Sequence, residues 1–268
     1  MKGLNPAELV DLALKLADES GPIVLNYFRK SLSVEFKSDD SPVTKADKEA
    51  ESALRRLLAL ETPNFGVFGE EYGEERINSE YVWVIDPIDG TRAFINGIPL
   101  FGTLIALTRH GKPILGLVDH PALKERWLGV DGQPTLHWGR GDEGVPVESR
   151  DCGMISKALL CASSPEMFSK NQLDLFNLVS DAARDTRFGT DCYGYSMLAS
   201  GQTDLVVEAG MQPYDYLAHA VVVSGAGGKI TDWKGEELTL NSSDTVVAAG
   251  SPKIHEQIIQ LFSNLKAK

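Results

Sequence analysis

Apolar residues recur every three or four positions in two segments of the first sixty residues. The first segment follows Asn5-Pro6, a pair typical of a helix N-cap with proline at the first helical position. It also contains Gly21-Pro22, where a helix can kink. The second segment starts at Thr44 and places Asp47 three residues later, which resembles a capping box. This spacing predicts two amphipathic helices that each bury one face.

Short apolar runs separated by turn residues replace this pattern between residues 64 and 138. The run 81–85 is aromatic and β-branched, and it stops at Asp86-Pro87. We expect the chain to turn there, because proline cannot donate to a sheet ladder. Hairpin signals with glycine and proline follow at residues 110–113 and 131–134. These features predict an antiparallel sheet in this part of the chain.

A segment rich in glycine and charge, residues 139–153, separates this sheet from a second half of different pattern. There, strands expected at 158–162, 205–208 and 229–233 alternate with helices expected near 173–184 and 214–224. We therefore predict an N-terminal α+β domain over residues 1–146 and a C-terminal α/β domain over residues 147–268.

Composition and charge restrict the partners that this chain can have. Its 268 residues carry 26 basic and 38 acidic side chains, a net charge of −12. Such a surface would repel nucleic acid and anionic membranes, so neither is an expected partner. Three scattered cysteines without a CxxC pair argue against a disulfide framework and a zinc knuckle, which favours a cytoplasmic location. No apolar run approaches the roughly 20 residues of a membrane helix, and no signal-peptide pattern opens the chain.

The densest group of candidate chemical residues lies directly after the apolar run 81–85. Asp86 and Asp89 stand three positions apart across the expected turn, and their carboxylates can converge on one point. The carbonyl of Ile88 between them supplies a third hard oxygen. Gly90 and Thr91 offer backbone N–H groups at the expected start of a short helix, which suits an anion.

Two further acids have a similar setting: Glu70 follows an apolar strand, and Asp215 opens a helix after Pro213. If Glu70 and Asp215 meet Asp86 and Asp89, each pair at about 4 Å repels by roughly 4 kcal/mol at an effective dielectric near 20. Such a cluster takes up protons or binds divalent cations. Oxygen ligands without histidine or cysteine favour Mg²⁺, or Mn²⁺, over zinc, and Asp86 would bridge two ions.

Each of these residues also has a simpler interpretation. Asp86-Pro87 is compatible with a plain turn, Asp215 with a helix N-cap, Glu70 with a solvated surface acid, and Asp47 with a capping box. The five histidines show no metal-binding spacing and are expected to be surface or core residues. The glycine-rich segment 225–228 is expected to cap a helix rather than bind a nucleotide.

Three motifs together closely resemble the inositol monophosphatase family over nearly the whole chain. They are Gly69-Glu70-Glu71, the segment 83–91 (Trp-Val-Ile-Asp-Pro-Ile-Asp-Gly-Thr) and Tyr214-Asp215. The last motif departs from the usual Trp-Asp of the family. The resemblance implies a five-layer αβαβα sandwich, a homodimer, inhibition by lithium, and most metal ligands in the N-terminal domain.

Other segments look more like the histidinol-phosphate phosphatase branch. They are 89–94, 189–195, and 207–210 leading into 213–215. Histidinol phosphate carries an ammonium group and an imidazole, which suit carboxylates and aromatic faces. Asp191 and Glu208 would supply the charge, with Tyr193 or Tyr195 beside the ring, although both tyrosines are equally compatible with core packing.

The resemblance also assigns roles, and it implies two or three Mg²⁺ ions per site. Glu70, Asp86 and the Ile88 carbonyl would hold one ion, Asp86, Asp89 and Asp215 a second, and Glu70 would help to place a third. Thr91, oriented by Asp47, and Glu70 would position and deprotonate the attacking water. The implied substrate-binding residues are Asp89, Gly90, Thr91, Asp191, Cys192, Glu208 and Asp215. Lys37 and the Asp39-Asp40 loop would close over the site.

The expected activity is therefore hydrolysis of a small phosphorylated metabolite, histidinol phosphate in the first place and inositol 1-phosphate as the alternative. Three other possibilities remain open at this point. They are a phosphatase with an aspartyl nucleophile, a non-catalytic Mg²⁺ or Ca²⁺ binding module, and an RNA-binding or regulatory adaptor with an idle site.

Overall fold

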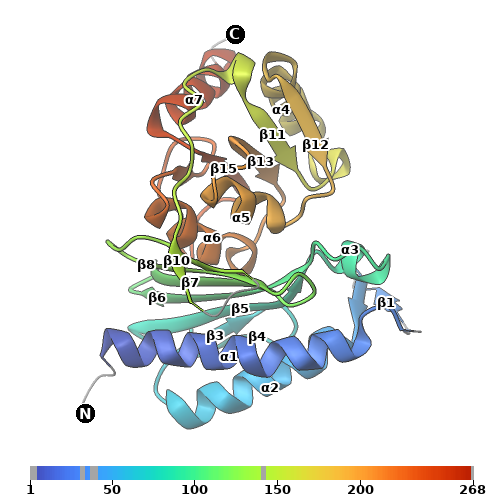
Figure 1. Ribbon diagram of the computed structural model, residues 1–268, viewed down its shortest axis with the longest axis vertical. Coiled ribbons are helices and arrows are strands. Elements are labelled where there is room, and N and C mark those ends of the chain that lie inside the picture. The colour runs from blue at the N-terminus through green and yellow to red at the C-terminus, as the bar shows by residue number, and fades with distance from the viewer. Residues whose placement is uncertain (1–4, 31–33, 37–41, 140–142, 267–268) are drawn as a thin grey trace.

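Helices and sheets alternate in five layers in the computed structural model, which describes residues 5–30, 34–36, 42–139 and 143–266. Figure 1 shows a layer of helices below a large sheet, a second layer of helices above it, then a smaller sheet and an outer layer of helices. This αβαβα arrangement confirms the expected fold class.

The larger sheet has the hydrogen-bonded order β10-β9-β8-β7-β6-β5-β3-β4. Its strands are β3 (Gly66–Gly69), β4 (Gly73–Glu75), β5 (Tyr81–Asp89), β6 (Gly102–Arg109), β7 (Lys112–His120), β8 (Glu125–Val130), β9 (Leu136–Trp138) and β10 (Val145–Pro146). The pairing is antiparallel except between β3 and β5, which run parallel. The expectation of an antiparallel sheet is therefore wrong at this pair, because β4 and β5 lie on opposite sides of β3 and the chain crosses over β3 between them.

The outer face of this sheet is covered by α1 (Pro6–Tyr27) and α2 (Lys45–Glu61). Asn5 and Glu8 form a capping box at the start of α1, and the helix continues through Pro22. Leu16 and Leu54 belong to the same buried apolar cluster as Trp83 and Ile85 of β5. A small hairpin of β1 (Val34–Phe36) and β2 (Pro42–Thr44) lies between the two helices in the chain. Lys37, Asp39 and Asp40, expected to close over the site, fall outside the described residues.

The middle layer consists of α5 (Tyr193–Ala199) and α6 (Pro213–Gly225), together with the short α3 (Thr91–Ile95) at its edge. Val82 and Val84, which alternate with Trp83 and Ile85 along β5, face this layer. The helix α6 lies very close to the sheet. A Cβ on Gly116 of β7 would overlap the backbone of Ala218, and one on Gly129 of β8 would lie 2.8 Å from Val221.

The smaller sheet has the order β12-β11-β13-β15-β14. Its strands are β11 (Leu159–Ala162), β12 (Asp185–Phe188), β13 (Leu205–Ala209), β14 (Lys229–Thr231) and β15 (Thr245–Ala249). The outer helices α4 (Lys170–Ala182) and α7 (Pro252–Lys266) pack on it through Phe176, Ile258 and Phe262, and two short 3-10 turns (Ile155–Lys157 and Pro165–Met167) precede α4.

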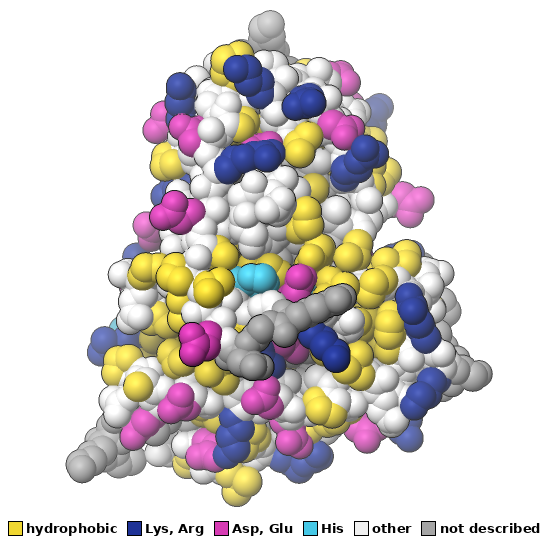
Figure 2. All heavy atoms as spheres, in the orientation of Figure 1, with side chains coloured by type: hydrophobic (Ala, Val, Ile, Leu, Met, Phe, Trp, Pro, Cys, Tyr) yellow, Lys and Arg dark blue, Asp and Glu magenta, His cyan; other side chains and the backbone are white. Residues whose placement is uncertain are grey.

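The last strand of the larger sheet ends at Pro146, and the smaller sheet begins at Leu159. The middle helices contact both sheets, so the division at residue 146 stays a prediction about domains. None of the helices formed by the described residues is long and apolar enough to span a bilayer. On the face in Figure 2, acidic and basic side chains are interspersed, and apolar side chains gather in a band across the middle.

Candidate active site

Three aspartates from two distant parts of the chain meet where the larger sheet faces the middle layer. Asp86 and Asp89 come from the end of β5, and Asp215 comes from the first turn of α6. One carboxylate oxygen of each lies within 4.8 Å of the others. The expected convergence of these acids is therefore present in the structure.

The end of β5 differs from the expected simple turn. The strand continues through Pro87 to Asp89, and a register shift against β6 falls between Asp86 and Asp89. Pro87 has no N–H for the ladder, and its carbonyl accepts a hydrogen bond from the Thr103 hydroxyl at 2.8 Å. Because of this bulge, the carboxylates of Asp86 and Asp89 can approach the same space although three positions separate them.

Local hydrogen bonds fix the two aspartates of β5. The Ile88 N–H donates to Asp86 Oδ1 at 2.9 Å, and the Cys192 N–H donates to Asp89 Oδ2 at 3.0 Å. The Ile88 carbonyl accepts the Thr91 hydroxyl at 3.1 Å. Gly90 has a φ of 80°, a left-handed conformation that glycine adopts without strain, and it leads directly into α3 as expected.

Asp215 is the third residue of α6, and its role in the helix start differs from the expected one. The N-cap is Gln212, and Asp215 Oδ2 accepts the Gln212 N–H at 2.7 Å in a capping box. Pro213 occupies the first turn. The N-cap interpretation of Asp215 was therefore wrong by three residues, but the capping box leaves the carboxylate in the acid cluster.

Glu70 lies next to Asp86 through the parallel pairing of β3 with β5, although its carboxylate is not among the oxygens that lie within 4.8 Å of one another. The Glu70 N–H donates to the Ile85 carbonyl at 3.2 Å, directly beside Asp86. The charge of its carboxylate contributes to the raised pKa values of Asp86 and Asp47. Glu70 is half-buried, which contradicts the interpretation as a solvated surface acid.

Mutual repulsion and burial dominate the electrostatics of this cluster. Burial, together with the charges of Glu70, Asp89 and Asp215, raises the pKa of Asp86 well above its usual range. Burial, with the nearby charges of Asp191 and Glu208, raises the pKa of Asp89 to about 7. Burial and the Asp89 charge raise the pKa of Asp215 well above its usual range. The cluster is thus costly as bare anions and favours a proton or a cation among its oxygens.

Asp47 forms the expected capping box of α2. Its Oδ2 accepts the N–H and the hydroxyl of Thr44 at 2.8 and 2.6 Å, and the Thr44 hydroxyl accepts the Ala46 N–H. Its other oxygen, Oδ1, is buried and has no hydrogen-bond partner among the described residues. Burial is the main cause that raises the pKa of Asp47 to about 6. A buried carboxylate oxygen without a donor is compatible with a ligand or water at this point.

The donor set fits a hard divalent cation. The converging ligands are carboxylate oxygens, and no histidine or cysteine belongs to the group found among the described residues. Oxygen-only sites of this kind suit Mg²⁺ or Mn²⁺. A cation would offset the burial and the repulsion that raise the pKa values of all three aspartates.

The residues expected to bind substrate line the smaller-sheet side of the cluster. Asp191 lies against Gly90 with a φ of 44°, and burial raises the pKa of its carboxyl. It borders a cavity of about 380 Å³ together with Arg92, Asn96 and Glu166. Cys192 is buried, and its N–H holds Asp89.

Glu208 is buried on β13 and fully occupied by local donors. Its Oε1 accepts the N–H of Ser163 at 2.8 Å and the Ser163 hydroxyl, and its Oε2 accepts the Tyr195 hydroxyl at 2.8 Å. Tyr195 is buried against His219, so the core-packing interpretation holds for this ring. Tyr193 donates to Glu125 at 2.8 Å.

Two residues with a role in shaping the site were not expected from the sequence. Ser163 follows β11 and binds Glu208, and Glu51 is a fully buried carboxylate of α2 beside Glu70. Ser163 carries no sequence signal of its own. Glu51 does, because it lies four residues after Asp47 and therefore on the same helix face.

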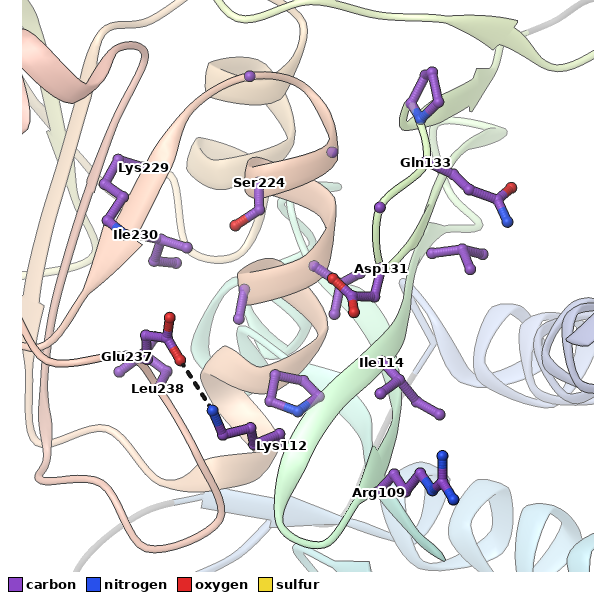
Figure 3. A pocket seen from close by; sticks show the side chains of 18 residues that line it. Arg109, Lys112, Ile114, Asp131, Gln133, Ser224, Lys229, Ile230, Glu237 and Leu238 are labelled. Carbon is purple, nitrogen blue, oxygen red and sulfur yellow. Dashed lines mark hydrogen bonds and ion pairs between the residues drawn. The ribbon is translucent and has the colours of Figure 1, made fainter.

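A second, larger cavity lies at the opposite end of α6. It measures about 720 Å³ and is bordered by the 109–114 hairpin, the 130–134 turn and the C-terminal end of α6. Figure 3 shows Lys112 paired with Glu237, with Ser224 and Lys229 both above this pair in the view. Ser224 stands nine residues after Asp215, about 14 Å along the helix. This cavity therefore does not belong to the acid cluster.

Comparisons with known proteins agree with this geometry. The model of the inositol monophosphatase family matches residues 5–267. The chain is 44% identical to the bifunctional phosphatase IMPL2, chloroplastic, of Arabidopsis thaliana, over 96% of this chain and 78% of that protein. It is 36% identical to the histidinol-phosphatase of Chlorobaculum parvum, over 89% of this chain and 91% of the relative. A solved inositol monophosphatase from Zymomonas mobilis superposes with a TM-score of 0.88 at 41% identity, covering 97% and 100% of the two chains.

Proposed function

Because the chain belongs to the inositol monophosphatase family, we propose that this metal-dependent phosphomonoesterase hydrolyses L-histidinol phosphate to L-histidinol. The observation that carries the metal-dependent chemistry is the meeting of Asp86, Asp89 and Asp215 within 4.8 Å. A group of one buried and two partly buried acids with raised pKa values is costly to the fold unless a bound cation compensates it.

We assign two or three Mg²⁺ ions to this cluster. Glu70, Asp86 and the Ile88 carbonyl would hold one ion, and Asp86, Asp89 and Asp215 a second, with Glu70 contributing to a third. Bound Mg²⁺ supplies charge neutralisation for the phosphate and for the leaving oxygen, and it lowers the pKa of bound water.

The chain's own residues then orient the reactants. The Thr91 hydroxyl, which donates to Ile88 in this structure, and the Glu70 carboxylate position and deprotonate the water. Asp47 would orient Thr91 only if the Thr91 hydroxyl turned from the Ile88 carbonyl to the buried Asp47 Oδ1, which has no hydrogen-bond partner among the described residues. The N–H groups of Gly90 and Thr91, at the start of α3, bind a phosphate oxygen.

The substrate preference rests on the acidic lining next to the cluster. Asp191 and Glu166 outnumber Arg92 among the charged side chains that border the 380 Å³ cavity, and a substrate with an ammonium group would find carboxylates there. The relative from Chlorobaculum parvum bears the name histidinol-phosphatase. The second candidate is inositol 1-phosphate, which the 41% identity to the Zymomonas mobilis inositol monophosphatase favours. Glu208 does not discriminate between the two substrates, because its buried carboxylate is already occupied by Ser163 and Tyr195.

One assay separates these possibilities. Purified protein is given histidinol phosphate or inositol 1-phosphate, with Mg²⁺ or with EDTA, and released phosphate is measured. We expect turnover with Mg²⁺, no turnover in EDTA, and a higher kcat/KM for histidinol phosphate. Equal or better turnover of the inositol ester would overturn the substrate choice, and full activity in EDTA would remove the metal chemistry.

The variant Thr91→Ala distinguishes an enzyme from a non-catalytic metal module in the same assay. We expect a loss of turnover of about 10²-fold or more, since the variant removes a group that orients water. An unchanged rate would contradict the role of Thr91. A homodimer, lithium inhibition and a cytoplasmic location stay predictions, and the relative from Arabidopsis thaliana is named as chloroplastic.

A further inference from the structure

Glu51 on α2 is a buried carboxylate that the proposed chemistry does not use. Its side chain has 0% exposure, and it lies one helical turn after Asp47 on the same face of α2. Burying a carboxylate is costly unless hydrogen-bond donors compensate it. Three N–H donors, two from the backbone and one from an arginine, contact the Glu51 carboxylate.

The donors belong to the loop that carries Glu70 and to one arginine. The Glu71 N–H donates to Glu51 Oε2 at 2.7 Å, and the Tyr72 N–H donates to Oε1 at 3.2 Å. Arg55 donates from Nε to Oε1 at 2.8 Å and from its other end to the Gly73 carbonyl. Since Gly69 pairs with Gly73 across β3 and β4, these contacts grip the whole turn 70–72.

Gly69 makes this grip possible. A Cβ at position 69 would overlap the carboxylate of Glu51, so only glycine lets the strand end lie against it. Gly69 immediately precedes Glu70. The backbone at Gly69 therefore determines both how closely Glu51 lies to the strand end and where Glu70 is placed.

Glu70 needs such a hold because its neighbours repel it. Its carboxylate faces that of Asp86, next to Asp89 and Asp215, and also acts on Asp47. A turn of three residues held only by its own backbone could move this carboxylate away from the cluster. Charge-assisted hydrogen bonds from the turn to Glu51, with Arg55 compensating the charge, oppose that movement.

We propose that Glu51 is a positioning residue that holds the turn 70–72 so that Glu70 can serve as a metal ligand. The inference rests on the proposed function, because it gives Glu51 a role in cation binding rather than in folding alone. Removing this support lowers the affinity of the cluster for a divalent cation.

Two variants on different elements test the inference. Glu51→Gln places an amide N–H₂ among backbone donors, and Gly69→Ala forces the Glu51 side chain away without changing it. Arg55→Lys is a milder third variant, since Arg55 retains 17% side-chain exposure and a lysine offers one nitrogen in place of the two that contact Glu51 and Gly73. It gives a result even if the two buried-site variants fail to fold.

A matched control comes from another buried carboxylate with the same kinds of partner. The Asp204 side chain is 1% exposed. Its carboxylate accepts hydrogen bonds from Nε and Nη2 of Arg150, both at 2.7 Å, and from the Leu159 N–H. Its contacts lie at the start of the smaller sheet, outside the acid cluster. Asp204→Asn therefore reproduces the loss of a buried, arginine-paired carboxylate without touching Glu70.

The measurement is the Kd for Mn²⁺ added to metal-free, full-length protein, with free Mn²⁺ followed by electron paramagnetic resonance. We expect the Kd to rise by about 10-fold or more in Glu51→Gln and Gly69→Ala, and by a smaller factor in Arg55→Lys, as for other residues that support metal ligands. In Asp204→Asn we expect a lower Tm and an unchanged Kd. The Mg²⁺ concentration for half-maximal activity should rise in parallel, with kcat partly recovered at saturating Mg²⁺.

A Kd equal to that of the wild type in the folded variants would overturn the role of Glu51 and leave the proposed function intact. An increase of the same size in Asp204→Asn would also overturn it, because a general loss of stability would then explain the effect. Absence of Mn²⁺ binding by the wild type would contradict the proposed function itself.

Discussion

Individual carboxylates decide the chemistry of this protein, and their cost is visible in the pKa values. Asp86, Asp89 and Asp215 all have raised pKa values because burial and mutual repulsion disfavour their charged forms. Few folds would retain such a group without a compensating ligand. The acids therefore lower the stability of the metal-free protein and raise its affinity for a cation.

Asp86→Asn should abolish turnover and leave the fold intact. The change removes a charge but little volume, and an asparagine oxygen can still accept the Ile88 N–H. We expect phosphate release to fall by at least about 10²-fold, because Asp86 is the proposed bridge between ions. Circular dichroism should be unchanged. Asp174→Asn, on the exposed face of α4, is the control and should retain full activity; substantial turnover in Asp86→Asn would show that the bridge is misassigned.

His219 provides a pH test away from the acids' own chemistry. It is fully buried against Tyr195, and neither ring nitrogen has a partner among the described residues. Burial lowers its pKa to about 3, against 6.5 in the unfolded chain. Because the folded pKa is depressed, protonation favours unfolding. Stability is retained above pH 6.5 and is lost as pH falls below it.

We expect His219 to cost about 2 kcal/mol of unfolding free energy between pH 8 and pH 5. His219→Phe keeps an aromatic ring on Tyr195 but cannot be protonated. The loss of unfolding free energy between pH 8 and pH 5, measured by urea denaturation, should therefore be smaller in the variant by this amount. His110→Asn, at an exposed turn, is the control and should follow the wild type. Equal pH dependence of His219→Phe and the wild type would show that His219 does not titrate in this way.

At the level of elements, much of the chain could be predicted from its local pattern. The caps at Asn5 and Thr44 define the starts of α1 and α2, and both are present as expected. The end of β5 could not be predicted in the same way. Proline normally ends the pairing of a strand. Here the Thr103 hydroxyl of the neighbouring strand donates to the Pro87 carbonyl, and a register shift accommodates the residues between Asp86 and Asp89. The end of β5 thus depends on contacts with β6, which the local sequence pattern does not show.

The position of α6 on the sheet determines where Asp215 lies. Gly116 and Gly129 let the helix approach strands β7 and β8 closely, and no periodicity in the sequence marks them as contacts. Glu51 was also missed because it stands among other polar residues of an amphipathic helix, although its spacing from Asp47 places it on the same face. Such features depend on which elements become neighbours.

Gly116→Ala should push α6 away from the sheet and displace Asp215. We expect a loss of about 1–3 kcal/mol in unfolding free energy, as for other overpacked sites, together with weaker Mg²⁺ binding. Asn5→Ala is a control of similar size, since removal of the α1 cap costs about 1 kcal/mol. Calorimetric titration with Mg²⁺ should show reduced affinity only in Gly116→Ala; equal affinities in the two variants would contradict the link between helix position and the site.

At the level of the whole molecule, the site exists only because the two halves of the chain come together. Asp86 and Asp89 belong to the larger sheet, while Asp215 follows the β13 strand of the smaller one. The motifs around these acids were specific enough to predict the group, although residues 86 and 215 are far apart in the sequence. The net charge of −12 makes a bound cation still more favourable.

The most direct test of the account locates the cation itself. Crystals grown with Mn²⁺ are measured at the manganese absorption edge, and an anomalous difference map is calculated. We predict at least one strong peak within about 2.0–2.3 Å of carboxylate oxygens of Asp86, Asp89 and Asp215. A map without a peak in this cluster, from protein that hydrolyses its substrate under the same conditions, would contradict the central claim.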